Sequence, residues 1–479
     1  MALPLSSRYR WGIALAVGLA CAMGIVVWRQ HQAQPRQVVL LDPLPQDSSI
    51  RVYFNQSQAS AYNEPYRDRH RPGDDLEQVI LDTIATAQVS IDVAVQELTL
   101  PRIAQALVEK HRAGVPVRLI VENSYNRTWS TFTADQVRQL DERDRQKYAD
   151  FLLLADDNQD GQVSASEAAQ ADALWLLTQA GIPMLDDTAD GSKGSDLMHH
   201  KFVVIDGQTV VTGSANFTLS GIHGDYGSAT SLGNVNHLVQ IEDGAIAQQF
   251  TSEFNLMWGD GPGRATDSQF GLQKPYRPPQ TIALTPASQV TVQFSPTSAS
   301  RLTWEESSNG LISQTLDTAT QSIDLALFVF SDQALSTRLQ APHQRGVQLR
   351  ALIDPGFAYR NYSEALDLMG VELGDRQCRY GKNNDPWETP LTSVGSPQLP
   401  DGDVLHHKFG VIDDRIVITG SQNWSEAANH HNDEVVLVID NATVAAHFER
   451  EFERLYRNTE LGIPPWLQEK IQAQQNQCD

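Results

Sequence analysis

The sequence predicts a duplicated α/β protein, in which two halves with mostly parallel sheets are related by a pseudo-twofold axis and follow an N-terminal transmembrane helix. Three observations predict this fold. Short apolar segments with strand character alternate with amphipathic helical segments, which is typical of helices packed on the faces of a sheet. The alternation recurs in the second half of the chain, and a long uncharged apolar run lies near the N-terminus. A chain of 479 residues is long enough for two domain-sized cores.

The predicted transmembrane helix is the apolar run from Trp11 to Trp28. Its length just suffices to cross a bilayer. Arg8 and Arg10 form a basic segment before it, and tryptophan at both ends suits the two membrane interfaces. We therefore expect residues 1–35 to anchor the protein in a membrane, with the rest of the chain exported to the periplasmic or extracellular side. Cleavage of the segment as a signal peptide, which gives a secreted protein, is the alternative.

The first half is expected over residues 50–258, after a polar linker. Hydrophobic periodicity predicts its leading elements in this order: strand Ile50–Phe54, helix Leu76–Thr86, strand Val89–Val95, helix Ile103–Arg112 and strand Val117–Val121.

The second half, expected over residues 287–460, repeats the first. Three of its segments correspond to three of the first half: Val292–Phe294 to Val52–Phe54, Ser322–Ala326 to Ser90–Ala94, and Leu349–Ile353 to Val117–Val121. Such self-similarity indicates an internal duplication. The intervening stretch 259–286 is rich in Gly and Pro and is the expected linker. Residues 461–479 are expected to form a C-terminal tail.

One motif occurs in both halves with equal internal spacing, each time between apolar runs. It reads His-x-Lys-x-x-x-x-Asp and is followed, seven residues after the Asp, by Gly-Ser-x-Asn. The first copy consists of His199, Lys201, Asp206, Ser214 and Asn216. The second copy consists of His406, Lys408, Asp413, Ser421 and Asn423.

The residue types in this motif suit the binding of an anion. His and Lys stand two apart in a predicted strand, so their side chains point to the same face. Lys supplies a positive charge, Asn and Ser supply donors, and imidazole supplies a nucleophile or a proton carrier. A buried Asp can hold the imidazole tautomer and stabilise its charged form. Two such sets around one anion suit phosphoryl transfer, in which positioning and charge stabilisation do most of the work.

The paired motifs resemble those of the phospholipase D superfamily, and the resemblance covers about residues 50 to 460. It implies a duplicated α/β/α sandwich with both motifs at the interface of the halves. It also implies a two-step phosphodiesterase reaction through a phosphohistidine, with no cofactor for catalysis. His199 is assigned as the nucleophile and His406 as the acid and base, although the symmetry of the motifs permits the reverse.

The resemblance implies roles for the remaining motif residues. Lys201, Lys408, Asn216 and Asn423 would bind the phosphate oxygens, and Ser214 and Ser421 would add donors. Asp206 and Asp413 would support the fold and charge balance of their own motifs. Family members also commonly carry a Glu that orients the histidine of the partner half. Glu434 stands at that place in the second half, whereas Asn236 stands at the aligned place in the first.

The first half is longer than the second by an insertion at about residues 134–180. It contains a segment that resembles the calcium loop of an EF-hand and that predicts a Ca²⁺ ion with a structural or regulatory role. Its flanks, 134–155 and 164–180, read as one helix each. A solvated acidic loop between helices is the alternative. The predicted ligands are Asp156, Asn158, Asp160, Gln162 and Glu167.

The composition bears on the substrate and the compartment. A net charge of −23 disfavours a nucleic-acid partner, and the predicted anchor places the site near lipid. We therefore expect hydrolysis of a phospholipid to phosphatidic acid and a head group. An endonuclease, a phosphatidyltransferase and a non-catalytic calcium-responsive scaffold are the alternatives. Cys378 and Cys478 either pair in an oxidising compartment or remain two free thiols. His223 is expected at the surface.

Overall fold

The computed structural model describes residues 40–192, 195–375, 377–381 and 383–478. The chain separates into a short unit, Met1–Leu41, and a large unit, Asp42–Asp479, which holds the fold described below. The predicted transmembrane helix lies outside the described residues, so it stays a prediction. Within the described ranges, no helix combines the length and the apolar character that a bilayer crossing needs.

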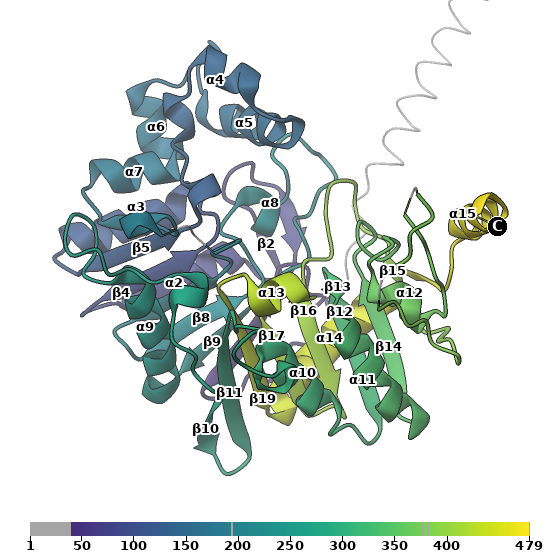
Figure 1. Cartoon of the computed structure of the whole chain (residues 1–479). Coiled ribbons are helices and arrows are strands. Elements are labelled where there is room, and N and C mark those ends of the chain that lie inside the picture. The colour runs from purple at the N-terminus through teal and green to yellow at the C-terminus, as the bar shows by residue number, and fades with distance from the viewer. Residues whose placement is uncertain (1–39, 193–194, 376, 382, 479) are drawn as a thin grey trace, which may run out of the picture. The chain divides into compact units, whose positions relative to one another are not determined.

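The first half forms a seven-stranded sheet in the order β1-β9-β8-β7-β4-β5-β6 (Figure 1). Its strands are β1 (Ile50–Phe54), β4 (Ile91–Val95), β5 (Val117–Val121), β6 (Met184–Asp186), β7 (Lys201–Ile205), β8 (Thr209–Gly213) and β9 (His237–Glu242). Its helices outside the insertion are α2 (Leu76–Thr86), α3 (Pro101–Arg112), α8 (Leu219–Ile222) and α9 (Gly244–Trp258). A small hairpin of β2 (Ala61–Asn63) and β3 (His70–Pro72) lies beside it.

The second half forms a nine-stranded sheet in the order β10-β11-β19-β17-β16-β12-β14-β15-β20. Its strands are β10 (Gln280–Thr285), β11 (Ser288–Ser295), β12 (Ser322–Leu327), β14 (Gln348–Ile353), β15 (Val394–Pro397), β16 (Lys408–Ile412), β17 (Ile416–Gly420), β19 (Glu434–Asp440) and β20 (Thr459–Leu461). Strands β13 (Phe330–Ser331) and β18 (Trp424–Ser425) pair separately. Its helices are α10 (Ser308–Leu316), α11 (Gln333–Gln344), α12 (Glu364–Leu368), α13 (Glu426–His430), α14 (Ala442–Tyr456) and α15 (Pro465–Cys478).

The predicted elements of the first half are confirmed with small shifts at their ends. Strands β1 and β5 and helix α2 have the predicted bounds. Helix α3 begins two residues earlier than predicted, at Pro101, because proline suits the first helical turn. Strand β4 begins two residues later than predicted. The reason is that the N–H groups of Gln88 to Ser90 donate to the carboxylate of Asp206 and not to the backbone of a neighbouring strand.

The expectation of mostly parallel sheets is corrected. Parallel pairing is found for β4-β5-β6 and for β12-β14-β15, whereas the remaining neighbours in both large sheets are antiparallel. The reason is that short turns join the strands that carry the motifs. Asp206 and Gly207 adopt positive φ between β7 and β8, and Asp413 and Asp414 do so between β16 and β17. Such turns return the chain beside itself, which produces hairpins.

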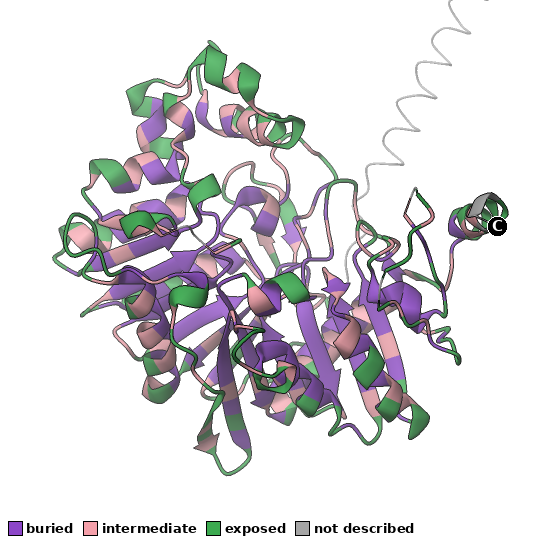
Figure 2. Cartoon of the chain, viewed as in Figure 1, coloured by how far each residue is buried: buried purple, intermediate pink, exposed green. Residues whose placement is uncertain are grey.

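The two halves share their largest hydrophobic core. The cluster contains strand residues of both sheets together with apolar side chains of α9 and α14, such as Phe250 and Phe448. Two further cores lie within one half each, under α2 and α3 in the first and under α10 and α11 in the second. Figure 2 shows the buried residues concentrated in the strands and the exposed residues on the outer helices. The duplication is therefore one packed unit in this structure.

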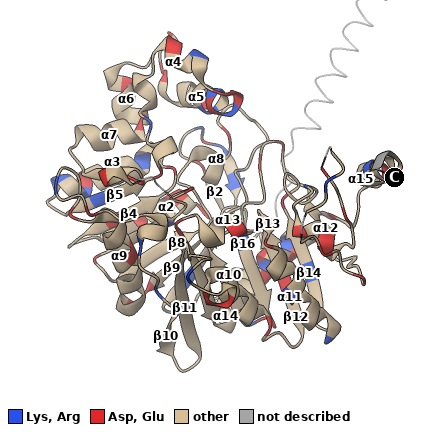
Figure 3. Ribbon diagram, viewed as in Figure 1, with Lys and Arg blue, Asp and Glu red and all other residues tan. Residues whose placement is uncertain are grey.

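The insertion consists of four helices, α4 (Ala134–Gln139), α5 (Glu142–Ala155), α6 (Ala165–Ala171) and α7 (Ala173–Gln179). The predicted single helix on each flank of the acidic loop is therefore wrong. The breaks fall at Asp141 and Asp172, whose carboxylates accept N–H groups of the first turn of α5 and α7. An Asp in this capping position starts a new helix. Acidic and basic side chains alternate along α5 (Figure 3).

Two segments expected to lack regular structure contain some. The predicted linker, 259–286, includes β10, and the predicted tail, 461–479, includes α15. Cys378 is disulfide-bonded, which excludes a free thiol at that position.

Candidate active site

The two motifs meet where the halves of the chain touch. Met198 forms a parallel bridge with Asp433, and Val235 forms a parallel bridge with Leu405. The N–H of His199 donates to the carbonyl of Asp433 at 3.0 Å. These bridges are equivalent under the pseudo-twofold relation, so each places a motif histidine against a strand of the other half.

Each motif histidine is bonded to a side chain of the other half. Nδ1 of His199 lies 2.7 Å from Oε2 of Glu434, and Nδ1 of His406 lies 2.9 Å from Oδ1 of Asn236. The predicted alignment of Asn236 with Glu434 is therefore confirmed. One imidazole faces a carboxylate and the other a neutral amide.

The amide of Asn236 is held in one orientation. Its Nδ2 donates to the carbonyl of Gly221 at 2.8 Å, and its Oδ1 accepts from the hydroxyl of Ser214 at 2.7 Å. Because Oδ1 only accepts, Nδ1 of His406 carries the proton. Nε2 of His406 therefore remains available to react with a substrate. Nε2 of His199 remains available in the same way, because the Nδ1 of His199 is bonded to Glu434.

The two serines serve the histidine partners, which corrects their predicted role as phosphate donors. Ser214 donates to Asn236. The Ser421 hydroxyl hydrogen-bonds to Glu434, and its oxygen accepts the N–H of Val435 at 3.1 Å. Both hydroxyls are fully buried. They therefore fix the groups that orient the imidazoles.

The two lysines are buried beside the histidines. Lys201 Nζ donates to Oε1 of Gln96 at 3.1 Å and to the carbonyl of His199 at 2.8 Å. Lys408 Nζ donates to the carbonyl of His406 at 2.6 Å and lies 5.0 Å from the ring centre of Phe328. Each carbonyl belongs to the histidine of the same motif, so the histidine and the lysine of each motif form one compact unit.

Gln96 and Phe328 are site residues that the sequence analysis missed. They follow β4 and β12 at equivalent places. Gln96 Oε1 also accepts from Nδ2 of Asn216 at 3.2 Å, whereas Phe328 packs its ring 4.8 Å from the ring of His406. Each of them follows the carboxyl end of a strand that pairs with a motif strand, β4 with β7 and β12 with β16. This position in the chain could have identified them from the sequence.

Both asparagines of the motif border the same region. Asn216 and Asn423 have a buried amide oxygen that, within the described part of the chain, accepts no hydrogen bond. Their amide NH₂ groups suit the oxygens of an anion. The structure thus keeps these two side chains uncommitted, apart from the contact of Asn216 with Gln96.

Burial and mutual repulsion favour neutral forms of the site's cations. Burial is the largest cause and lowers the pKa of both His199 and His406, and Lys201 and Lys408 lower both further. Burial also lowers the pKa of Lys201 to about 7. The same burial raises the pKa of Glu434 to about 7. An anion at this place would restore the positive charge of the lysines.

The aspartates of the motif lie away from the imidazoles, so a role in holding the histidine tautomer is wrong. Asp206 accepts the N–H groups of Gln88, Val89 and Ser90. Asp413 accepts the N–H groups of residues 320, 321 and 322 in the same way. Their role is to close the strand turn, and Glu434 is the carboxylate that contacts a histidine.

The predicted calcium loop connects α5 to α6 with oxygen atoms turned inward. Carboxylate oxygens of Asp156 accept the N–H groups of Asp160 and Gly161, and Oδ1 of Asn158 accepts that of Asp160. Gly161 has a φ of +79°, as the sharp turn requires. Hard oxygen donors in this order fit the chemistry of Ca²⁺. The predicted ligands Gln162 and Glu167 complete the segment, with Glu167 at the start of α6.

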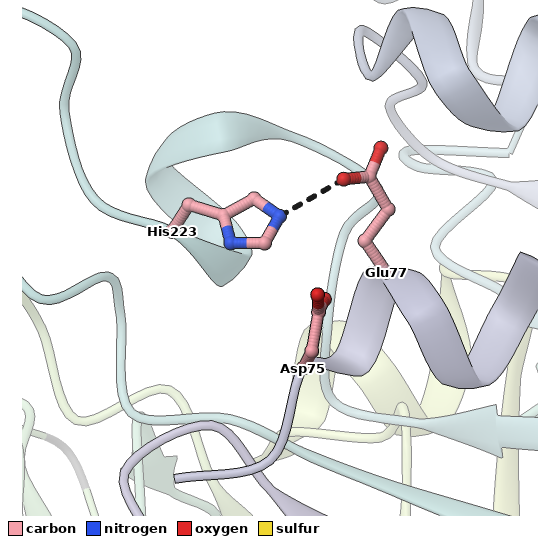
Figure 4. Close-up of side chains that lie close together, drawn as sticks. All are labelled: Asp75, Glu77 and His223. Carbon is pink, nitrogen blue, oxygen red and sulfur yellow. Dashed lines mark hydrogen bonds and ion pairs between the residues drawn. The ribbon is translucent and has the colours of Figure 1, made fainter. Parts of the chain in front are cut away.

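Asp75, Glu77 and His223 form a further cluster, in which Glu77 and His223 are buried and Asp75 is partly buried (Figure 4). His223 is fully buried, so its predicted surface position is wrong. Its Nε2 lies 3.1 Å from Oε2 of Glu77, and its Nδ1 lies 2.9 Å from the hydroxyl of Tyr62. Both ring nitrogens are thus used, and the cluster ties α2 to the segment after α8.

The chain was compared with known proteins. The family described as "Cardiolipin synthase, PLD-like domain" matches residues 80–258 and 312–456. The mitochondrial cardiolipin hydrolase of Mus musculus is 31% identical over 153 residues, which are 32% of this chain and 59% of that protein. A phospholipase D of Rickettsia bellii (strain RML369-C) is 28% identical over 148 residues, 31% of this chain and 63% of that protein.

These curated relatives are matched over about three fifths of their own length. Among solved structures, the phosphatidylserine synthase of Haemophilus influenzae Rd KW20 is similar, with a TM-score of 0.51 and 13% identity over 88% of this chain and 89% of that one. At this identity the likeness shows the fold. Taken with the paired motifs where two similar halves meet, the family match over well over half of the sequence shows that the chain belongs to the PLD-like domain family of the phospholipase D superfamily.

Proposed function

We propose that the protein hydrolyses a phospholipid to phosphatidic acid and a free head group, through a phosphohistidine formed on His199. The observation that carries this proposal is the unequal pairing of the two histidines, His199 with Glu434 and His406 with Asn236. A reaction in two steps needs one imidazole that holds a positive charge while the intermediate lives. The carboxylate is on the side of His199.

In the first step, Nε2 of His199 attacks phosphorus and the bond to the head-group oxygen breaks. His406 donates its Nε2 proton to that leaving oxygen. The phosphorylated imidazole still carries a proton on Nδ1 and is cationic, and Glu434 Oε2, at 2.7 Å, balances this charge. The two lysines and the two asparagine amides of the motifs bind the non-bridging oxygens.

In the second step, Nε2 of His406 takes a proton from water as the oxygen attacks phosphorus and the P–N bond breaks. His406 therefore leaves the cycle protonated, as it began. Burial lowers the pKa of His406, and the charges of the two lysines lower it further. The diester anion offsets the charges of the lysines, so its binding favours the protonated form of His406 in the resting complex.

Two observations support a phospholipid over a nucleic acid. The chain carries a net charge of −23, which repels an extended polyanion. Similar proteins bear the names cardiolipin hydrolase and phospholipase D. Location supports the same choice, because the predicted helix Trp11–Trp28 would anchor the protein in a membrane and Cys378 is disulfide-bonded, as exported proteins often are. We propose export to the periplasmic or extracellular side.

The test is a side-by-side assay of the full chain on phospholipid vesicles and on single-stranded DNA. We expect head-group release from the vesicles, and its loss in His199→Asn. His431→Asn is the matched control, since this histidine is exposed in the loop after α13. Cleavage of DNA alone would indicate that the protein is a nuclease. Head-group release that persists in His199→Asn would exclude a phosphohistidine on His199.

Transfer to an alcohol is the second candidate for the same intermediate. The phosphohistidine reacts with whichever hydroxyl reaches phosphorus, so water and an added primary alcohol compete. Adding glycerol to the vesicle assay and separating phosphatidic acid from phosphatidylglycerol measures the partition. We expect phosphatidic acid to dominate; a product that is mostly phosphatidylglycerol would assign the protein as a transferase.

We also propose that Ca²⁺ binds the loop from Asp156 to Glu167. The support is the donor set of the loop and the two helices that flank it, α5 and α6. When bound, the ion would hold the end of α5 to the start of α6. The catalytic steps above do not pass through it.

A further inference from the structure

An open cavity lies where the insertion meets the core of the first half. Glu97 and Thr218 line it from the first-half core, and Lys147 and Asp150 line it from α5. Glu97 directly follows Gln96, which contacts Lys201, and Thr218 stands two residues after Asn216. Two residues of extended chain span about 7 Å, so the cavity begins within the reach of a head group whose phosphate is bound by the motif residues.

The charges on the cavity wall leave an excess of carboxylate. Lys147 Nζ donates to both oxygens of Glu97, at 2.7 and 2.9 Å, so these two charges cancel. Asp150 and Asp225 remain. Asp150 accepts only weakly, from the N–H of Gly227 at 3.3 Å and a glutamine amide at 3.5 Å.

Asp225 is the least satisfied of these groups. In the part of the chain that the structure describes, its carboxylate accepts no hydrogen bond, although it is half-buried. The nearby Arg67 is committed elsewhere, because its Nε lies 2.6 Å from Glu64 and its other nitrogens donate to carbonyls of residues 223–226. Burial raises the pKa of Asp225 to about 6; repulsion from Asp150 and Asp403 adds to the effect, and attraction to Arg67 opposes it. At neutral pH the Asp225 side chain is therefore mostly an ionised carboxylate that accepts no hydrogen bond from the described residues, and a bound cation would stabilise it further.

Aromatic rings complete the wall. Trp129, Phe151 and Tyr226 line the cavity together with leucine side chains. A positive group beside such rings gains cation–π energy, and its methyl or methylene groups gain apolar contact. Aromatic ring faces attract an organic ammonium ion, and neighbouring carboxylates add an opposite charge.

We propose that this cavity receives the ammonium group of the substrate's head group, so that the enzyme prefers zwitterionic phospholipids such as phosphatidylethanolamine and phosphatidylcholine. This inference rests on the proposed phospholipid hydrolysis. It also predicts that the enzyme disfavours cardiolipin, because the second phosphate of cardiolipin would meet Asp150 and Asp225. The insertion, which only the first half carries, thus becomes a selector of head groups.

The test measures kcat/KM of the full chain on vesicles that contain phosphatidylethanolamine, phosphatidylglycerol or cardiolipin at equal mole fraction. We expect at least a tenfold preference for phosphatidylethanolamine, and we expect Asp225→Asn and Asp150→Asn each to reduce that preference about tenfold, the worth of roughly one cation contact. Asp317→Asn, at the exposed end of α10, is the matched control and should keep the wild-type preference.

A soluble probe separates this inference from the proposed function. Phosphocholine and glycerol phosphate compete against hydrolysis of bis-p-nitrophenyl phosphate, a diester that needs no membrane. Phosphocholine should inhibit about tenfold more strongly, and Asp225→Asn should erase that difference. Equal inhibition by both compounds, or a wild-type preference for cardiolipin, would overturn the inference while leaving phospholipid hydrolysis intact. Cleavage of the soluble diester without release of any lipid head group would overturn both.

Discussion

Nδ1 of His199 lies 2.7 Å from the carboxylate of Glu434, a residue 235 positions later in the chain. The equivalent contact of His406 is made by the amide of Asn236 at 2.9 Å. Two motifs with identical residues are thus made unequal by their partners. A two-step reaction uses its two imidazoles in different roles, and the next three predictions depend on this difference.

Replacing Glu434 by Gln should lower kcat about 30-fold, because a hydrogen bond to a charged partner contributes about 2 kcal/mol. The pH profile should change as well. Burial raises the pKa of Glu434 to about 7, so the wild-type rate should rise with pH through that value as the carboxylate ionises. This rising limb should vanish in the variant. A rising limb that survives in Glu434→Gln would show that another group produces it.

Replacing Asn236 by Asp should raise the pKa of His406, because its Nδ1–H would then donate to a carboxylate. The general acid must be protonated, so activity is lost as pH rises through its pKa. We therefore expect the falling limb of kcat to move to higher pH by about one unit. Thermal unfolding is the companion measurement, since the lost donor to Gly221 should lower the stability by about 1–3 kcal/mol. An unmoved falling limb would assign it to Lys201 instead.

The assignment of the nucleophile is checked by a substrate that needs no acid. Bis-p-nitrophenyl phosphate has a good leaving group, so His406→Asn should release one equivalent of p-nitrophenol in a burst and then stall as the phosphohistidine. His199→Asn should give no burst. Quench-flow kinetics with detection of the phosphorylated residue by mass spectrometry measures both. A burst in His199→Asn alone would reverse the roles of the two histidines.

Glu253 should be among the most sensitive positions for stability. Its buried carboxylate pairs with Lys274 and Arg277 of the segment between the halves and lies 2.9 Å from Nε2 of His200. Glu253→Ala would leave these groups buried without a partner and should cost about 3–5 kcal/mol in urea unfolding. Glu242→Gln, which removes an exposed pair with Arg51, is the control and should cost less than about 1 kcal/mol. Equal losses would argue against a role for the Glu253 cluster.

The calcium loop predicts a stabilisation that depends on the ion. At a free Ca²⁺ concentration one hundred times the dissociation constant, the free energy of unfolding should rise by about 2.7 kcal/mol. Calorimetry with and without chelator measures the shift in Tm. Glu167→Gln should abolish it, whereas Glu142→Gln, at the exposed start of α5, should retain it. Identical melting curves with Ca²⁺ and with chelator would contradict the proposal.

The sequence was sufficient for the residues whose positions follow from the duplication. Because the motif spacing repeats, the alignment of Asn236 with Glu434 could be read without a structure. The resemblance to the family then implied that a residue at this place lies beside the histidine of the other half. The bounds of β1, β5 and α2 were equally local, since each is a short periodic run between turn residues.

What the sequence could not provide depends on contacts between distant segments. Asp206 turns its carboxylate to N–H groups 116 to 118 residues away, and His223 is buried by a glutamate 146 residues away. No local pattern records either contact. The serines were misassigned for the same reason, because Ser214 reaches Asn236 only after β8 and β9 have paired.

The contact between the two halves determines when the candidate site is complete during synthesis of the chain. His199 and Lys201 are synthesised early, but Glu434 leaves the ribosome only after another 235 residues. At about 5–20 residues per second this delay is on the order of ten seconds or more. A nascent chain, or a fragment cut between the halves, therefore has His199 without the carboxylate of Glu434, and it has Lys201 without Lys408. The candidate site is therefore complete only when translation of the chain is nearly finished.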